Sequence, residues 1–145
     1  MSTKRSTSAA SAAAASLETG SRRPYRLLIV DDSNIMRRRI ERSQQFEELE
    51  VVGAASNGIE ALELFRKTDP DLVTMDLTMP QMDGIECIEA LVRIKPTVRI
   101  LVISALADKA TAVDAMEKGA NGFLHKPFTD RQLNEAIAEL MSGGG

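Results

Sequence analysis

The sequence predicts an α/β fold, a doubly wound sandwich built on a five-stranded parallel sheet. Short apolar runs alternate with amphipathic segments five times, at spacings of about 20–25 residues. The central runs are apolar throughout, which is typical of parallel strands covered by helices on both faces. The core residues are Leu, Ile, Val, Ala and Met, with only 3% aromatic residues and no Trp, which disfavours an aromatic-rich β sandwich. Right-handed crossovers then favour strand order 2-1-3-4-5, with the switch point between strands 1 and 3.

Length and charge set the domain organisation. The 145 residues predict one domain over residues 25–142, after a disordered, Ser/Ala-rich tail over 1–24 and before a frayed end over 143–145. The tail carries a net charge of +3 and the remainder −6, and an acidic body argues against a nucleic-acid partner. No apolar run approaches the ~20 residues needed to span a bilayer. The lone Cys87 cannot form an internal disulfide, so we expect a cytoplasmic protein. We expect a monomer, with a transient dimer as the alternative.

The first strand is predicted over residues 25–30, and it ends at the acidic pair Asp31-Asp32. Ser33 or Asp32 is expected to cap the following helix. Its inward residues are predicted to be Ile35, Met36 and Ile40, and its outward residues Arg37, Arg38, Arg39 and Arg42. These arginines are most simply a solvated face, and docking of an acidic partner on the first three is the alternative.

The second strand is predicted near residues 49–54. Asn57 with Glu60 forms a variant of the capping box at the start of the next helix. Ile59, Leu62 and Phe65 are predicted to share the inward face of that helix. The helix is expected to end at residues 69–71, Asp-Pro-Asp.

The third strand begins at Leu72 and carries Asp76 at its end. Pro80 prevents this strand from continuing because proline lacks an N–H group and has a fixed φ. Asp83 caps the third helix, which ends at Lys95-Pro96. Its apolar positions are Ile85, Ile88, Leu91 and Val92, and Cys87 is expected on the packed side as an inert thiol.

The fourth strand is predicted over residues 99–104 and the fifth over 122–125. The helix between them is predicted to turn Ala110, Val113 and Met116 inward and to end at Gly119. Thr129 with Gln132 is expected to cap the last helix. Its inward residues are Leu133, Ile137, Leu140 and Met141.

Charged residues follow the carboxyl ends of the strands, which is where open α/β sheets bind ligands. The predicted strand order places Asp31, Asp32 and Asp76 side by side, so that they raise one another's pKa values. A bound Mg²⁺ relieves this repulsion. Ser104 and Lys126 end the last two strands, on the side of Asp76 away from the acidic pair. Such a set of groups stabilises a phosphoryl group during transfer, and a carboxylate can serve as the nucleophile.

Four separated motifs carry a family resemblance. They are Asp31-Asp32, the stretch MDLTMPQMDG over residues 75–84, Ser104-Ala105, and Lys126-Pro127-Phe128. Together they resemble the receiver domain of two-component response regulators, over about residues 25–142. No output domain follows, so the chain resembles a stand-alone, CheY-like receiver with the flavodoxin-like (βα)5 fold.

This resemblance implies a role for each site residue. Asp76 accepts a phosphoryl group from a sensor histidine kinase or phosphotransfer protein. Asp32, Asp76 and the backbone carbonyl of Thr78 bind Mg²⁺ directly, with Asp31 acting through water, and Mn²⁺ can substitute. Lys126 pairs with the phosphoryl oxygens and Ser104 moves to donate a hydrogen bond to one of them. The Lys126–Pro127 peptide is expected to be cis.

The resemblance further implies a switch in place of a turnover enzyme, with intrinsic self-phosphorylation and slow self-dephosphorylation. Phe123, where many relatives have Tyr, changes rotamer and remodels the surface of the fourth helix, fifth strand and fifth helix. That surface would bind a downstream protein such as a flagellar motor switch or a signalling protein, which favours chemotaxis. No nucleic-acid partner or membrane insertion is expected.

Three alternatives remain at this point. The protein could be a phosphate sink or adaptor in another two-component pathway. A Mg²⁺-dependent aspartyl-phosphate phosphohydrolase is disfavoured, because such enzymes need a second acid near the nucleophile and Thr78 stands at that position. A flavin- or nucleotide-binding domain is disfavoured because residues 31–34, Asp-Asp-Ser-Asn, would repel phosphate.

Overall fold

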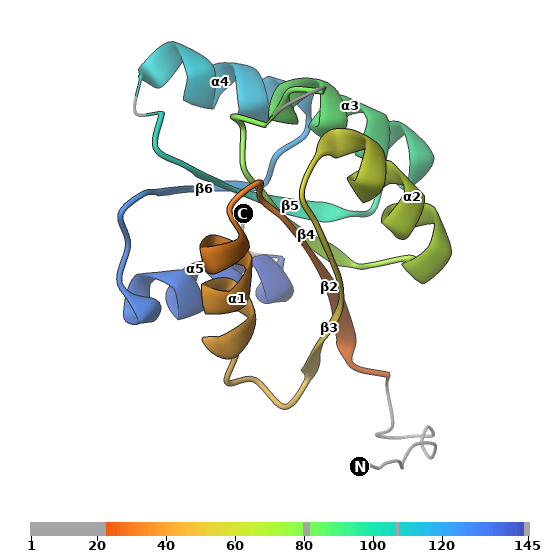
Figure 1. The fold of residues 1–145 in the computed structure, drawn as a ribbon, viewed down its shortest axis with the longest axis vertical. Helices are drawn as coiled ribbons and strands as arrows, with labels where there is room; N and C mark the ends of the chain where they lie inside the picture. The colour runs from red at the N-terminus through yellow and green to blue at the C-terminus, as the bar shows by residue number, and fades with distance from the viewer. Residues whose placement is uncertain (1–22, 80–81, 107, 144–145) are drawn as a thin grey trace.

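The computed structural model describes residues 23–79, 82–106 and 108–143, which form one parallel sheet covered by helices on both faces (Figure 1). The strands lie in the order β3-β2-β4-β5-β6. Their bounds are Tyr25–Val30 for β2, Leu49–Ala55 for β3, Leu72–Met75 for β4, Arg99–Ser104 for β5 and Gly122–His125 for β6. In chain order this is 2-1-3-4-5, so the predicted fold class and its switch point are confirmed.

The helices alternate with the strands along the chain. They are α1 (Asn34–Arg42), α2 (Gly58–Thr68), α3 (Gly84–Ile94), α4 (Lys109–Lys118) and α5 (Asp130–Ser142). Helices α2, α3 and α4 cover one face of the sheet, whereas α1 and α5 cover the other (Figure 1). None of the helices in the described part of the chain is long and apolar enough to cross a membrane.

Each face of the sheet has its own apolar layer because successive strand side chains point to opposite faces. Leu28 and Val30 of β2 pack with the α2–α4 layer. Leu27 and Ile29 pack with the α1–α5 layer. All four side chains are essentially inaccessible to solvent. The uninterrupted apolar run in the sequence therefore corresponds to a strand buried on both sides.

Side chains cap four of the helices at predicted residues, with one difference in α2, and Asp108 caps α4, for which no N-cap was predicted. Asn57 accepts the backbone N–H of Glu60, but the Glu60 carboxylate accepts the N–H of Ser56 and does not close a box on Asn57. The capping box between Thr129 and Gln132 is complete in both directions. Ser33 is the cap of α1, and its hydroxyl accepts the N–H of Met36.

Three predicted helix faces are wrong in part. Ile35 is 78% exposed and Ile59 52% exposed, and on α4 Val113 and Met116 are each 45% exposed, with Ala110 exposed as well. The residues predicted to face inward on α2 and on α4 are spaced three positions apart. The first and last of each set are therefore six positions apart, and they point about 120° apart around the helix. Positions seven apart lie within about 20°, and α2 accordingly buries Gly58, Ala61 and Phe65.

Helix α1 does not bury all three of its predicted inward residues. Ile35 and Met36 are neighbours and point about 100° apart, so a narrow contact with the sheet takes only one of them. The helix buries Ile40, and Met36 packs against the same layer.

Several predictions concern the chain ends. The predicted disordered tail over residues 1–24 lies largely outside the described residues, as do Pro80 and residues 144–145. Gly143, which was assigned to a frayed end, caps α5 with a positive φ of 72°. Its N–H donates to the carbonyls of Glu139 and Leu140.

Candidate functional site

Backbone register brings the predicted site residues to one edge of the sheet. Val30 of β2 pairs with Met75 of β4, so the residues that follow them leave the sheet at the same level. The N–H of Asp76 donates to the carbonyl of Val30 at 2.9 Å. On the other side of β4, the N–H of Lys126 donates to the carbonyl of Ser104 at 2.9 Å. Strand pairing alone therefore assembles this edge.

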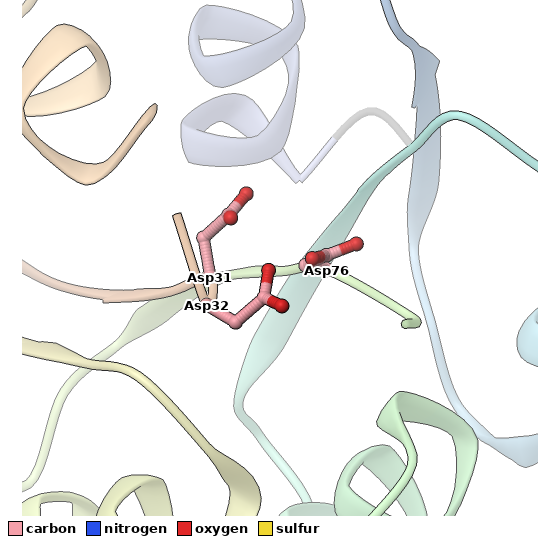
Figure 2. Close-up of side chains that lie close together, drawn as sticks. All are labelled: Asp31, Asp32 and Asp76. Atoms are coloured by element: carbon pink, nitrogen blue, oxygen red, sulfur yellow. The ribbon is translucent and has the colours of Figure 1, made fainter. Parts of the chain in front are cut away.

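Three carboxylates converge there (Figure 2). Asp31, Asp32 and Asp76 each offer an oxygen, and these oxygens all lie within 4.8 Å of one another. Asp31 and Asp76 are 1% and 3% exposed, whereas Asp32 is exposed. The predicted acidic cluster is confirmed, with two buried acids and a third that faces solvent.

The carboxylate of Asp76 is contacted on one oxygen. Its Oδ1 accepts the N–H of Thr78 at 3.3 Å and the Thr78 hydroxyl at 3.4 Å. The ammonium Nζ of Lys126 lies 3.9 Å from the same Oδ1. The other oxygen, Oδ2, has no hydrogen bond to any residue in the described ranges. That oxygen is available to a ligand.

The environment of Asp76 disfavours its charged form. Burial, and after it the charge of Asp31, raise the pKa of this carboxyl to about 6 in spite of the opposing effects of Lys126 and the Thr78 amide. At pH 7 the group is ionised, in an unfavourable environment that a cation would relieve. For Asp76, this agrees with the predicted repulsion by the neighbouring acids.

The backbone of Lys126 follows β6 as predicted, but its charged group does not stay on the predicted side of Asp76. Its strand flanks β5 and not the acidic pair, but its side chain extends past Asp76, and Nζ lies 3.0 Å from Oδ2 of Asp31. The four-carbon stem of lysine makes this reach possible. The other oxygen of Asp31 accepts the N–H of Ser33 at 2.9 Å. Lys126 was predicted to lie on the side of Asp76 away from the acidic pair. For its ammonium group this prediction is wrong, because Nζ contacts Asp31.

Two further predicted residues make no hydrogen bond to the acids: Ser104 at this edge, and Phe123 two residues before the end of β6. Ser104 is fully buried and its Oγ accepts the N–H of Leu106 at 3.0 Å. Phe123 is partly buried and packs against the α2–α4 layer. The Lys126–Pro127 peptide bond is cis.

Sequence reasoning missed two groups at the site. Arg37 donates from its guanidinium to the carbonyl of Asp31 at 2.7 Å, so it supports the acidic pair from α1. The prediction placed this arginine on a solvated face, and a polar residue at the first turn gives no signal of such a contact. The contact of the Thr78 hydroxyl with Asp76 was also missed, because Thr78 was expected to contribute a backbone carbonyl and to lack an acid.

The donors at this edge suit a hard divalent cation. They are carboxylate oxygens, and a buried acid with a raised pKa lies among them. The carbonyl of Thr78 accepts no hydrogen bond within the described residues, so it too is available as an oxygen ligand. Sulfur and imidazole ligands are absent from this cluster of described residues, which disfavours a softer metal.

Comparison with protein families matches residues 27–138 to the response regulator receiver domain. Among curated proteins, the chain is 41% identical over 115 residues to the chemotaxis protein CheY of Thermotoga maritima, covering 79% of this chain and 96% of that protein. It is 40% identical over 118 residues to the chemotaxis protein CheY of Bacillus subtilis, covering 81% of this chain and 98% of that protein.

Solved structures show the same similarity. The crystal structure of the CheX-CheY-BeF3-Mg²⁺ complex from Borrelia burgdorferi matches with a TM-score of 0.75 and 30% identity, covering 85% of this chain and 91% of that chain. The receiver domain of the putative response regulator NarL from Mycobacterium tuberculosis matches with a TM-score of 0.76 and 33% identity, covering 84% and 99%.

Proposed function

The chain belongs to the response regulator receiver family and is homologous to CheY, and on that premise we propose that Asp76 is its phosphoacceptor. The observation that carries this assignment is the position of Asp76 itself. It is a buried carboxylate within 4.8 Å of two other acids and 3.9 Å from an ammonium group, with one oxygen not engaged by the described residues. A buried acid in this setting is poised to react with an electrophile.

The proposed step is a phosphoryl transfer to Asp76. An oxygen of its ionised carboxylate forms a bond to phosphorus, and the P–N bond to the donor's phosphohistidine breaks with its electron pair returning to the imidazole. The product is an acyl phosphate on Asp76. Oδ2 is the proposed nucleophile because Oδ1 already accepts from Thr78.

Asp32, Asp76 and the Thr78 carbonyl are proposed to hold Mg²⁺ or Mn²⁺, with Asp31 acting through water. The cation supplies charge neutralisation for the carboxylates and the incoming phosphoryl oxygens. The fit is supported by the separation of the three acids and by the raised pKa of Asp76.

Lys126 and Ser104 are proposed to stabilise the phosphoryl group. The Lys126 ammonium already lies between Asp31 and Asp76, so it needs only a small movement to pair with an oxygen on phosphorus. The Ser104 hydroxyl would exchange its contact with the Leu106 amide for one with the phosphoryl group. Phe123 is the proposed switch residue that passes this change to the surface of α4, β6 and α5.

We propose a protein partner for that surface, after phosphorylation by a histidine kinase or phosphotransfer protein. Chemotaxis is the favoured pathway because relatives that the chain covers almost end to end are CheY chemotaxis proteins. A phosphohydrolase is disfavoured because Thr78, whose hydroxyl lies 3.4 Å from Asp76, is a poor proton donor in place of an acid. A phosphate sink remains the alternative output.

The proposal is tested by incubating wild type and Asp76→Asn with acetyl phosphate, with Mg²⁺ or with excess EDTA. We expect a base-labile phosphoryl mass increase on wild type with Mg²⁺ only. Asp83→Asn is the matched control, since Asp83 is an exposed acid that caps α3 near the same edge, and it should be labelled like wild type. Label on Asp76→Asn, or equal labelling without metal, would contradict the assignment.

A pull-down from cell extract then separates the outputs. Wild type with beryllofluoride should retain a protein that unmodified wild type does not. A phosphate sink would retain none in either state.

A further inference from the structure

Arg39 of α1 contacts the segment that joins β6 to α5. Its guanidinium donates to the carbonyl of Phe128 at 2.6 Å and to the carboxylate of Asp130 at 3.2 Å. The same guanidinium lies over the Phe128 ring, 4.4 Å from the ring centroid. Three contacts from one side chain thus join two segments that are 89 residues apart in the chain.

This arrangement differs from an ordinary surface ion pair, which contributes little to stability. The arginine side chain is only 35% exposed, and the ring beneath it belongs to a buried residue of the α1–α5 layer. A planar guanidinium can donate in its plane and stack on a ring through its face, which lysine does less well. The Asp130 carboxylate also accepts the hydroxyl of Ser43, the C-cap residue of α1, at 3.3 Å, so α1 and its C-cap contact the start of α5 at two points.

Phe128 lies two residues after Lys126, so a fixed Phe128 limits where the lysine can lie. The backbone of Lys126 is fixed on its other side by its hydrogen bond to the carbonyl of Ser104. The segment that carries the ammonium is therefore tied to β5 at one end and to α1 at the other. Charge-assisted hydrogen bonds are short and directional, so the 3.0 Å contact between Lys126 and Asp31 depends on this placement.

We propose that Arg39 is a positioning residue for the proposed phosphoryl-transfer site. By holding the Phe128 carbonyl and ring, it keeps the Lys126 ammonium between the two buried carboxylates Asp31 and Asp76. Arg39 itself touches neither acid among its described contacts, so it acts through Lys126. This inference rests on the proposed phosphoacceptor role of Asp76.

The test is a double-mutant cycle in the full chain. The variants are Arg39→Met, which keeps the apolar stem, together with Lys126→Ala and the double variant. Arg39→Lys is the conservative variant. Arg42→Met is the matched control, because Arg42 is exposed on the same helix and its guanidinium makes no ion pair with a described residue. The phosphorylation rate with acetyl phosphate and saturating Mg²⁺ is measured for each, beside the midpoint of thermal unfolding.

We expect Arg39→Met to slow phosphorylation about tenfold, since a misplacement of about 1 Å can cost up to 10²-fold. In the Lys126→Ala background the same substitution should have no further effect on the rate. Arg39→Lys should recover part of the rate, and Arg42→Met should match wild type. An unchanged rate in Arg39→Met, or an equal loss in both backgrounds, overturns the inference, because the second result is what general destabilisation produces.

A crystal structure of Arg39→Met gives a measurement that does not depend on phosphorylation. We expect the Lys126 ammonium to leave Asp31, whereas a retained distance near 3.0 Å overturns the inference. If wild type takes no label at all, the phosphoacceptor role fails, and this distance still decides whether Arg39 positions the lysine.

Discussion

Asp76 combines two properties that oppose each other in the folded protein. Its position at the end of β4 removes it from water, which disfavours its charge, while its proposed chemistry requires that charge. The folded-state pKa of about 6 lies above the ordinary value of 3.8, so the folded protein binds this proton more tightly than the unfolded chain does. The contribution of Asp76 to the free energy of unfolding is therefore highest below about pH 4. It falls as the pH rises towards 6 and stays lower above that pH.

We predict that Asp76→Asn stabilises the metal-free protein at pH 7. The rise of the Asp76 pKa from 3.8 to about 6 corresponds to a loss of at most about 3 kcal/mol in the free energy of unfolding at pH 7. An amide of the same shape removes this cost because it carries no charge. Thermal unfolding between pH 3.5 and 8 should show the gain disappear below about pH 4, where the carboxyl is protonated in both states. Asp32→Asn is the control, with a smaller gain because Asp32 is exposed. A gain that persists at low pH would contradict this explanation.

The start of α3 lies close to the residues that follow β4. The N–H of Gly84, the first residue of α3, donates to the carbonyl of Leu77 at 3.0 Å. A Cβ atom at Gly84 would lie 2.5 Å from the carbonyl oxygen of Asp76 and 2.6 Å from the Cα of Leu77. Both are backbone atoms that cannot rotate away, so the start of α3 can approach the site only because this residue has no side chain.

We predict that Gly84→Ala destabilises the protein by about 1–3 kcal/mol, the usual cost of forcing extra atoms into a packed site. Alanine at a helical position normally stabilises a protein by roughly 1 kcal/mol relative to glycine. A loss of stability in Gly84→Ala would therefore indicate the clash and not the helix propensity of the new residue. Urea unfolding measures the change. Gly122→Ala is the control, since its Cβ would meet only the end of the Leu101 side chain, at 3.2 Å, and we expect a smaller effect. Equal effects for the two variants would disprove the backbone clash.

The helices show how far a local pattern identifies a buried face. The pattern located all five described helices and the N-caps of four of them, but it missed the α4 cap Asp108, and α2 and α4 are rotated from the faces predicted for them. On α4 the only fully buried residue is Ala115, and Gly119 at its end packs against Val92 of α3. Small residues on this helix allow a close approach to α3, so its larger apolar side chains remain exposed to solvent. The hydrophobic pattern alone predicted that the larger side chains would be buried.

The molecule as a whole has two apolar layers separated by the sheet. Ile88 of α3 lies in the layer under α2–α4, and Ile137 of α5 lies in the layer under α1 and α5. Both are fully buried. Since the layers share no member, a cavity in one should leave the packing of the other unchanged.

We predict that Ile88→Val and Ile137→Val each destabilise by about 0.5–1.5 kcal/mol. The double variant should show the sum of the two changes to within roughly 0.5 kcal/mol. Ile35→Val is the control and should change stability by less than about 0.5 kcal/mol, because Ile35 is 78% exposed. Urea unfolding measures all four variants, and strong non-additivity would show that the layers are coupled through the sheet.

The sequence by itself determined the elements, their order in the sheet and the acidic edge. These follow from local periodicity, from turn and cap residues, and from the rule that parallel strands end at one edge. Asp31, Asp32, Asp76, Ser104 and Lys126 each follow or end an apolar run, so their common location was readable before the structure.

Only the tertiary structure decided which side chains meet across that edge. Lys126 contacts Asp31 over 95 residues of chain, and Arg39 contacts Phe128 over 89. Such contacts depend on side-chain length, on rotamers and on the rotation of each helix about its axis, and none of these has a local pattern. The sequence thus predicts that a lysine and three acids share an edge. Packing decides that the ammonium lies between two of the acids and that Arg39 of α1 contacts the segment that carries this lysine.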